Sequence, residues 1–148
     1  MTVATQNPAA FLNTTRDVAA PRSSRAALYT GRVMSGLAVL FLGADAAFKL
    51  IAHPAVVQGT ADLGFPPGSH TIIGLLALGC WVLYLAPRTA LLGAVLWTGY
   101  LGGAIATHLR MDNPLFSHTL FPIYVAILLW GGLYLRDARV RNLFARTA

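Results

Sequence analysis

The sequence predicts an all-α fold, an integral membrane four-helix bundle with both termini in the cytoplasm. Hydrophobic residues make up 56% of the 148 residues and charged residues only 11%, whereas ordinary soluble domains contain roughly 25% charged residues. The apolar residues gather into four long runs, and most arginines lie before the first run or after the last. Because backbone groups in lipid must be hydrogen-bonded internally, long apolar runs without polar alternation indicate helices.

Each apolar run is expected to form one helix. A helix needs about 20 apolar residues to cross the hydrocarbon core, and the second run is the shortest. That run contains TIIGLLALGCWVLYLA, which has no polar stripe, so it does not resemble a surface helix of a soluble protein. The expected helices cover about residues 33–52, 70–86, 89–109 and 115–135. They form a domain over 31–137, between a flexible cytoplasmic tail over 1–30 and a basic cytoplasmic tail over 138–148.

The arginines predict the orientation, because positive residues beside membrane helices are retained on the cytoplasmic side. Those that precede the first run or follow the last are Arg16, Arg22, Arg25, Arg32, Arg136, Arg139, Arg141 and Arg146. Both termini are therefore expected inside, which agrees with an even number of helices. The net charge of +6 does not indicate nucleic-acid binding, which normally needs a basic patch interleaved with aromatic residues.

The segment between the first two helices, HPAVVQGTADLGFPPGSH, is long for a connection without an evident helix. We expect it to pack on the bundle as a cap, and a lid over a ligand is the alternative. The apolar residues available for this packing are Val56, Val57, Leu63 and Phe65.

The third and fourth helices carry three further signals. Gly99 and Gly103 are four residues apart, a spacing that lets membrane helices approach closely, and we expect them to pack against another helix. Tyr100 lies beside that face and is expected to form a hydrogen bond inside the bundle. Pro122 removes a backbone hydrogen bond and is expected to kink the fourth helix near its outer end.

Asp45 and Lys49 lie in the outer half of the first helix. Four residues apart, their side chains share a face and can form an ion pair. Pairing reduces the insertion cost, which is roughly 2.5–3.5 kcal/mol for a charge at the centre of a membrane helix. His53 would extend the polar stripe, although Pro54 disfavours helical geometry there. Two interpretations stay open: a functional site, or a pair that only fixes the rotation of the helix.

Other polar residues are expected in the same outer layer: His53, His70, His108, Arg110, Asp112, Asn113, Ser117 and His118. Histidines can ligate haem or a metal, or hydrogen-bond a quinone carbonyl. No HxxxH pair occurs, so we expect no metal site. Cys80 is the single cysteine, which excludes dithiol chemistry within the chain, and no hydrolase motif or phosphate-binding glycine loop is present.

Five segments follow one another along the chain: FKL at 48–50, LGFP at 63–66, APRTALLGA at 86–94, TGYLGGAIATHLR at 98–110 and NPLFSHTLFPIYVAILLWGGLYLRD at 113–137. Together they resemble the DoxX-like family of small bacterial membrane proteins, over about residues 35–140. The resemblance implies a four-helix bundle in the bacterial cytoplasmic (inner) membrane. Relatives in that family are associated with thiosulfate:quinone oxidoreductase or with redox homeostasis complexes. Many members carry a glutamate in the second helix where this chain has Ala77, which leaves Asp45 as the carboxylate available to Lys49.

We therefore hypothesise a polar pocket on the outer side, with the Asp45–Lys49 pair as its floor. The candidate ligand-binding residues are Asp45, Lys49, His53, Tyr100, His108, Arg110 and His118. The expected ligand is a quinone or a similar lipid-soluble molecule, or a redox partner protein docks there, and we expect no independent catalytic activity. The alternatives are a non-catalytic scaffold or assembly subunit, for which the glycine-rich third helix offers a homo-oligomer contact, and a small-solute permease, which the lack of internal repeats disfavours.

Overall fold

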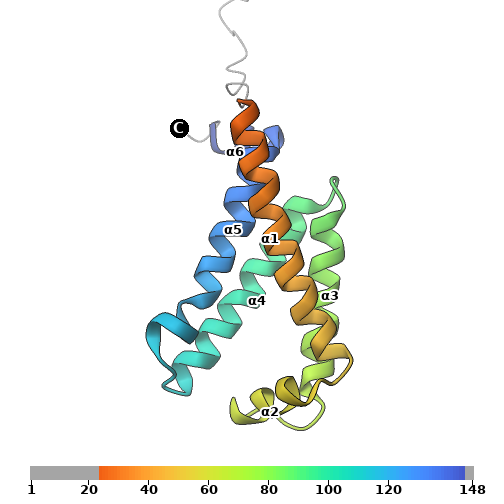
Figure 1. Cartoon of the computed structure of the whole chain (residues 1–148), viewed down its shortest axis with the longest axis vertical. Helices are drawn as coiled ribbons and strands as arrows, with labels where there is room; N and C mark the ends of the chain where they lie inside the picture. Colours follow the sequence, from red (N-terminus) through yellow and green to blue (C-terminus); the bar gives the residue numbers. More distant parts are fainter. Residues whose placement is uncertain (1–23, 146–148) are drawn as a thin grey trace, which may run out of the picture.

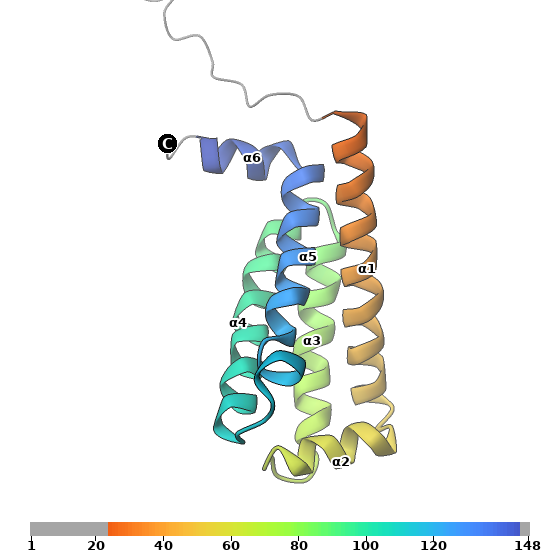
Figure 2. The same cartoon turned by 60° about the vertical axis from the view of Figure 1, so that its left-hand side comes forward.

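The computed structural model describes residues 24–145, and this part of the chain is all-helical, without strands, as the sequence predicts. Its elements are α1 (Arg25–Leu50), α2 (Pro54–Asp62), α3 (Ser69–Leu85), α4 (Ala90–Arg110), the π-helical turn η2 (Leu115–Thr119), α5 (Phe121–Arg136) and α6 (Ala138–Ala145). The long helices α1, α3, α4 and α5 run side by side (Figure 1). α2 and α6 lie across opposite ends of them (Figure 2), which we call the α2 end and the α6 end. Most of the predicted N-terminal tail and the last residues of the C-terminal tail lie outside the described residues.

Three helical segments are long and apolar enough to cross a membrane: Arg25–Leu50, Ala90–Arg110 and Leu115–Arg136. The fourth long helix, α3, is apolar but has only 17 residues, in agreement with the short second run. Large apolar side chains such as Leu40 and Ile72 remain exposed, at 72% and 64%. Apolar surface of this extent marks contact with a membrane or a partner, and together with the helix lengths it identifies a membrane protein.

α1 begins at Arg25, well before the predicted residue 33, because Ser24 caps its first turn. The Ser24 hydroxyl accepts a hydrogen bond of 3.1 Å from the backbone N–H of Ala27, which satisfies one of the unpaired donors of the helix N-terminus. The apolar run marks only the part of the helix that is suited to lipid, so the sequence analysis assigned these polar turns to the tail. At its other end α1 stops at Leu50, and Ala52 adopts a left-handed φ of 51°.

The connection after α1 contains a helix that the sequence analysis did not predict. α2 begins with Pro54, which is favoured in a first helical turn because its missing N–H is not needed there. Val56, Leu63 and Phe65 are half-buried, whereas Val57 is 38% exposed. The segment therefore lies across the ends of α1 and α3 as a cap (Figure 1), with three of the four expected apolar residues facing inward.

Near the α6 end the helices approach one another at backbone distance. A methyl group at Gly31 of α1 would lie 3.0 Å from the carbonyl oxygen of Gly132 on α5, and one at Gly93 of α4 would overlap the backbone of Tyr84 on α3. Tyr84 is 1% exposed, and its hydroxyl donates a hydrogen bond of 2.9 Å to the carbonyl oxygen of Leu129 on α5. α3 is thereby held against both α4 and α5 at this end.

Among residues 24–145, no other helix lies close to Gly99 or Gly103, so the predicted close packing is not made within this part of the chain. A methyl group at either position would meet no atom within 4 Å. The reason is that α3 and α4 are joined by a short turn at the α6 end and diverge toward the α2 end (Figure 1). The close glycine contact of α4 is made by Gly93, near the turn, and Gly99 and Gly103 lie where the two helices have diverged.

The predicted fourth helix is divided in two. η2 ends at Thr119, the chain bends at Leu120, and α5 starts at Phe121 with Pro122 in its first turn. Because Pro122 has no N–H to donate to the preceding turn, the helix is interrupted where the kink was predicted. The two pieces together still form one membrane-length segment, Leu115–Arg136.

The C-terminal residues form α6, which turns away from α5 at Asp137 and lies across the end of the long helices (Figure 2). Val140 is 1% exposed and joins the core, and the Arg141 guanidinium donates to the carbonyl oxygens of Tyr134 and Leu135 at 3.1 and 3.0 Å. The arginine thus satisfies carbonyl groups that the end of α5 leaves unpaired.

The close contact between α1 and α5 predicts a strong effect of a single methyl group. At Gly132 it would lie 2.5 Å from Ser35 Oγ and 2.7 Å from the Ser35 backbone nitrogen, so Gly132→Ala must push α1 and α5 apart. We expect the free energy of unfolding in detergent to fall by about 1–3 kcal/mol, the usual cost of overpacking. Gly36→Ala on α1 is the control, because a methyl group there meets nothing within 4 Å. Equal stability of the two variants would contradict the close approach.

Candidate functional site

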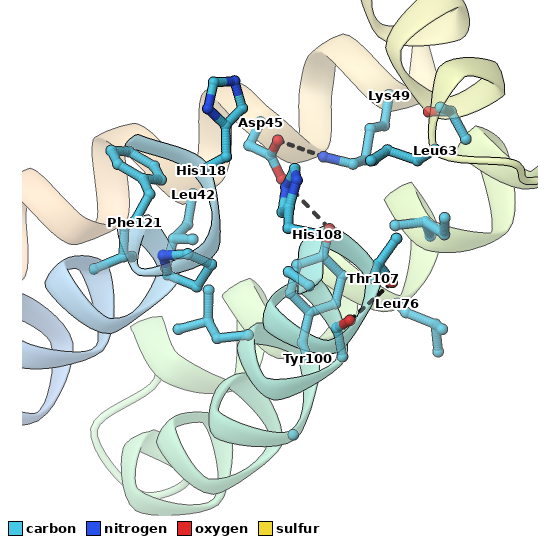
Figure 3. Close-up of a pocket in the computed structure, with 18 of the residues that line it drawn as sticks. Leu42, Asp45, Lys49, Leu63, Leu76, Tyr100, Thr107, His108, His118 and Phe121 are labelled. Atoms are coloured by element: carbon cyan, nitrogen blue, oxygen red, sulfur yellow. Dashed lines mark hydrogen bonds and ion pairs between the residues drawn. The ribbon is translucent and has the colours of Figure 1, made fainter. Parts of the chain in front are cut away.

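A cavity of about 450 Å³ lies between the long helices toward the α2 end (Figure 3). α1, α4 and the η2–α5 segment supply most of its walls, and α3 and the α2 segment supply the remainder. Most of its lining side chains are apolar, among them Phe41, Leu42, Leu101, Phe121 and Val125. The cavity exists because the helices that touch near the α6 end have separated at this level.

The Asp45–Lys49 pair faces this cavity. The Lys49 ammonium donates to Oδ1 of Asp45 in an ion pair along one face of α1, and both residues line the cavity. The side chains are 15% exposed for Lys49 and 30% exposed for Asp45. The i, i+4 spacing on a helix places the two groups together, so the pair expected from the sequence is present.

Tyr100 extends the pair across the cavity from α4. Its hydroxyl donates to Oδ2 of Asp45 at 3.5 Å, and Figure 3 shows the two side chains approaching from facing helices. The ring is held edge-on against the fully buried Trp97, with 4.9 Å between the ring centres. A bond of 3.5 Å is long for an O–H donor, so the ring of Tyr100 is held in place while its hydroxyl is only weakly bonded to Asp45.

His108 and His118 lie at the edge of the cavity, where the end of α4 meets η2. Their rings are 5.8 Å apart, centre to centre, at 63°. Each has one further polar partner: Asn113 Nδ2 is 3.0 Å from Nδ1 of His108, and Ser117 Oγ is 2.8 Å from Nδ1 of His118. Two histidines ten positions apart in the sequence are thus brought into contact, which no spacing rule predicted.

A second chamber of about 410 Å³ adjoins the first under α2. It shares with the first the residues Lys49, Thr60, Leu63, His108 and His118. Lys49 therefore stands between an apolar chamber among the helices and a more polar one toward the α2 end. The α2 segment contributes to both, so its residues act as a wall of the site as well as a cap.

Two of the predicted site residues do not line the main cavity. His53 is exposed at the start of α2, with its ring 5.3 Å from that of Phe48. The polar stripe cannot reach it, because α1 has already ended at Leu50. The exposed Arg110 instead donates from Nη2 to the carbonyl oxygen of Leu63 at 2.9 Å, and so ties the end of α4 to the segment that follows α2.

Several cavity residues were not among the predicted site residues. Gly99, Gly103 and Thr107 all line the cavity from α4. Phe41 and Phe121 form an edge-on pair with ring centres 5.3 Å apart between α1 and α5. The available signal was helical spacing: Phe41 precedes Asp45 by four residues, and Thr107 follows Tyr100 by seven, so each shares a face with a polar residue already identified.

The donors and acceptors suit a ligand with carbonyl or hydroxyl groups. The Lys49 ammonium and the Tyr100 hydroxyl can donate to a carbonyl oxygen, and Asp45 can accept from a hydroxyl. Among residues 24–145, no three histidine, cysteine or acidic side chains are grouped as a metal site. Ala77 is fully buried and lies outside the cavity lining, in which Asp45 is the only carboxylate.

The DoxX-like family matches residues 33–132, which is more than half of the chain. No curated protein and no solved structure matches the chain. The matched range runs from α1 through most of α5 and contains every residue of the main cavity.

Because the ion pair lies in a largely apolar cavity, the effect of removing one charge on the free energy of unfolding should depend on whether the other charge is present. Lys49→Met leaves the Asp45 carboxylate in the cavity without a cation, and we expect a loss of about 1–3 kcal/mol in unfolding free energy, less than for a fully buried pair because both side chains are partly exposed. The double variant Asp45→Asn/Lys49→Met is expected to recover at least half of that loss. Denaturant titration of the four proteins in detergent measures this cycle, and simple additivity of the two substitutions would contradict it.

Proposed function

We propose that this chain, which belongs to the DoxX-like family, is a four-helix integral membrane protein that binds a quinone in the cavity between its helices. In this proposal α1, α3, α4 and α5 all cross the bacterial cytoplasmic membrane, and the protein serves as the quinone-binding membrane subunit of a redox system. Electrons would be exchanged with a partner protein, since the chain has a single cysteine and cannot form a dithiol.

The arginines support an orientation with both termini in the cytoplasm. Arg25, Arg32, Arg136 and Arg139 all belong to segments at the α6 end, and cationic residues beside membrane helices favour the cytoplasmic side. The cavity and its histidines then lie toward the outer surface. Four crossings place both chain ends on one side, and in this proposal α3 completes its crossing with the residues that flank its 17-residue helix.

The observation that carries the proposal is the Asp45–Lys49–Tyr100 cluster inside an apolar cavity. Ionisable residues in membrane helices are costly and usually mark a site. A cavity of about 450 Å³ falls in the range of small-molecule sites, which is about 300–1,000 Å³. A quinone combines a flat apolar ring with two carbonyl oxygens. The ring suits the apolar walls of the cavity, and the carbonyl oxygens suit its few hydrogen-bond donors.

Lys49 and Tyr100 are the two donors in this proposal. Tyr100 is bonded to Asp45 only at 3.5 Å, so its hydroxyl can rotate toward a carbonyl oxygen at little cost. Lys49 is held in place by Asp45, which orients the ammonium while leaving two of its three protons for other acceptors. Asp45 would then position Lys49 and Tyr100. Its carboxylate would also accept a hydrogen bond from a hydroxyl group of the reduced ligand.

A scaffold or assembly subunit is the competing function, and extraction of the purified protein separates the two. We expect protein isolated in mild detergent to contain a quinone, detected by its ultraviolet spectrum and by mass spectrometry of an organic extract. Asp45→Asn keeps an oxygen acceptor but removes the charge, and its extract is expected to contain less. A wild-type protein that carries no quinone and binds none when it is added would support the scaffold.

The role of Tyr100 predicts a measurable loss of affinity. Tyr100→Phe keeps the ring against Trp97 but removes the hydroxyl, so binding of menadione, a quinone without a tail, is expected to weaken about 2- to 10-fold, the equivalent of one hydrogen bond. Titration of protein in nanodiscs measures the dissociation constant. Tyr124→Phe is the matched control, because Tyr124 is 46% exposed on α5 and lies outside the cavity. Equal effects of the two substitutions would contradict the role of Tyr100.

A further inference from the structure

The cavity borders on a gap between α3 and α4 in the half of the molecule toward the α2 end. The two helices are in contact near their connecting turn, where Gly93 meets the backbone of Tyr84. From there they diverge (Figure 1). The apolar chamber lies at the level where they have separated, with Ile73 and Leu76 of α3 on one side and Gly103 and Thr107 of α4 on the other.

Residues along this gap line the cavity and are solvent-exposed. Leu76 is 61% exposed although it lines the cavity. Gly99 and Gly103 are likewise exposed lining residues, and a methyl group at either would meet no atom within 4 Å. Exposed lining residues without close neighbours do not seal a cavity, so this wall leaves the chamber open between α3 and α4.

The other directions are more closed. Between α1 and α5, Phe41 and Phe121 are also exposed lining residues, but their rings pack edge-on and close this side. Toward the α6 end, the Tyr84 hydroxyl lies 3.2 Å from Ser35 Oγ and donates to Leu129, in the region where the glycines bring the backbones together. Toward the α2 end, the α2 segment covers the chamber and is tied to α4 by the bond from Arg110. Of these sides, the gap between α3 and α4 is the one without such a contact at the level of the chamber.

We propose that the ligand carries a long apolar tail, enters from the bilayer through this gap, and leaves its tail between α3 and α4. This inference rests on the quinone site proposed above and specifies the class of molecule that the site takes. The polar head lies against Lys49 and Tyr100. A tail can pass beside Gly99 and Gly103 because glycine has no side chain to block the gap. In a bilayer the gap must be filled by an apolar chain, and a tail joined to the bound head fills it without the separate ordering of a lipid.

The glycines allow a matched test with two ligands. Menadione and phylloquinone have the same head, and only phylloquinone has a long tail. In nanodiscs, with ligand expressed as a fraction of lipid, Gly99→Leu places a side chain in the tail path and is expected to weaken phylloquinone binding at least about 10-fold more than it weakens menadione binding. Gly102→Leu is the control, because Gly102 is exposed, has nothing within 4 Å and does not line the cavity.

Each outcome of this test has one meaning. If Gly99→Leu affects neither ligand, or both equally, the tail does not pass through the gap and the inference is wrong while the quinone site stands. If the wild-type protein binds neither ligand, the proposed function itself fails.

A second measurement uses only the wild-type protein and so does not depend on the folding of a variant. A phylloquinone analogue with a photoreactive diazirine in its tail is irradiated in nanodiscs, and the labelled peptides are identified by mass spectrometry. Label on peptides from α3 and α4, removed by excess phylloquinone, is expected. Competed label confined to α1 or α5 would overturn the inference, and label that phylloquinone does not remove would mean that a lipid chain fills the gap instead.

Discussion

The close approach of helix backbones near the α6 end is the constraint on which the rest of the structure depends. Gly31, Gly93 and Gly132 leave no room for side chains where α1 meets α5 and where α4 meets α3. Straight helices that touch at one end and cross at an angle must separate at the other. The cavity is the space that this separation leaves, and η2, α2 and the side chains between the helices only partly fill it.

The polar residues Asp45, Lys49 and Tyr100 line this cavity. An ion pair pressed between touching helices would lose all contact with water, and the cost of removing both charges from water can exceed their attraction. At the level of the cavity, Asp45 and Lys49 keep partial exposure and a second chamber toward the α2 end. Tyr100 reaches the pair from α4 across this space. The same separation that weakens packing thus makes a charged group tolerable.

The fold was predictable from the sequence to the extent that it depends on hydropathy. The apolar runs located four helices, and Pro122 located the interruption of the last one. The start of α1 was missed because a helix continues past its apolar part when a serine caps it, and α2 was missed because nine residues are too few to show a period. The glycine contacts were misassigned: Gly99 and Gly103 have the spacing of a packing motif, but spacing does not show which helix, if any, lies opposite.

By itself the sequence determined the all-helical class, the membrane-like apolar surface and the Asp45–Lys49 contact. These depend on composition and on neighbours along one helix, where four residues always make about one turn. Only the tertiary structure decided that Tyr100 faces the pair, that His108 meets His118, and that the end of α1 leaves His53 outside the cavity lining. Such contacts join different helices, and their geometry depends on crossing angles that are set by packing elsewhere in the molecule.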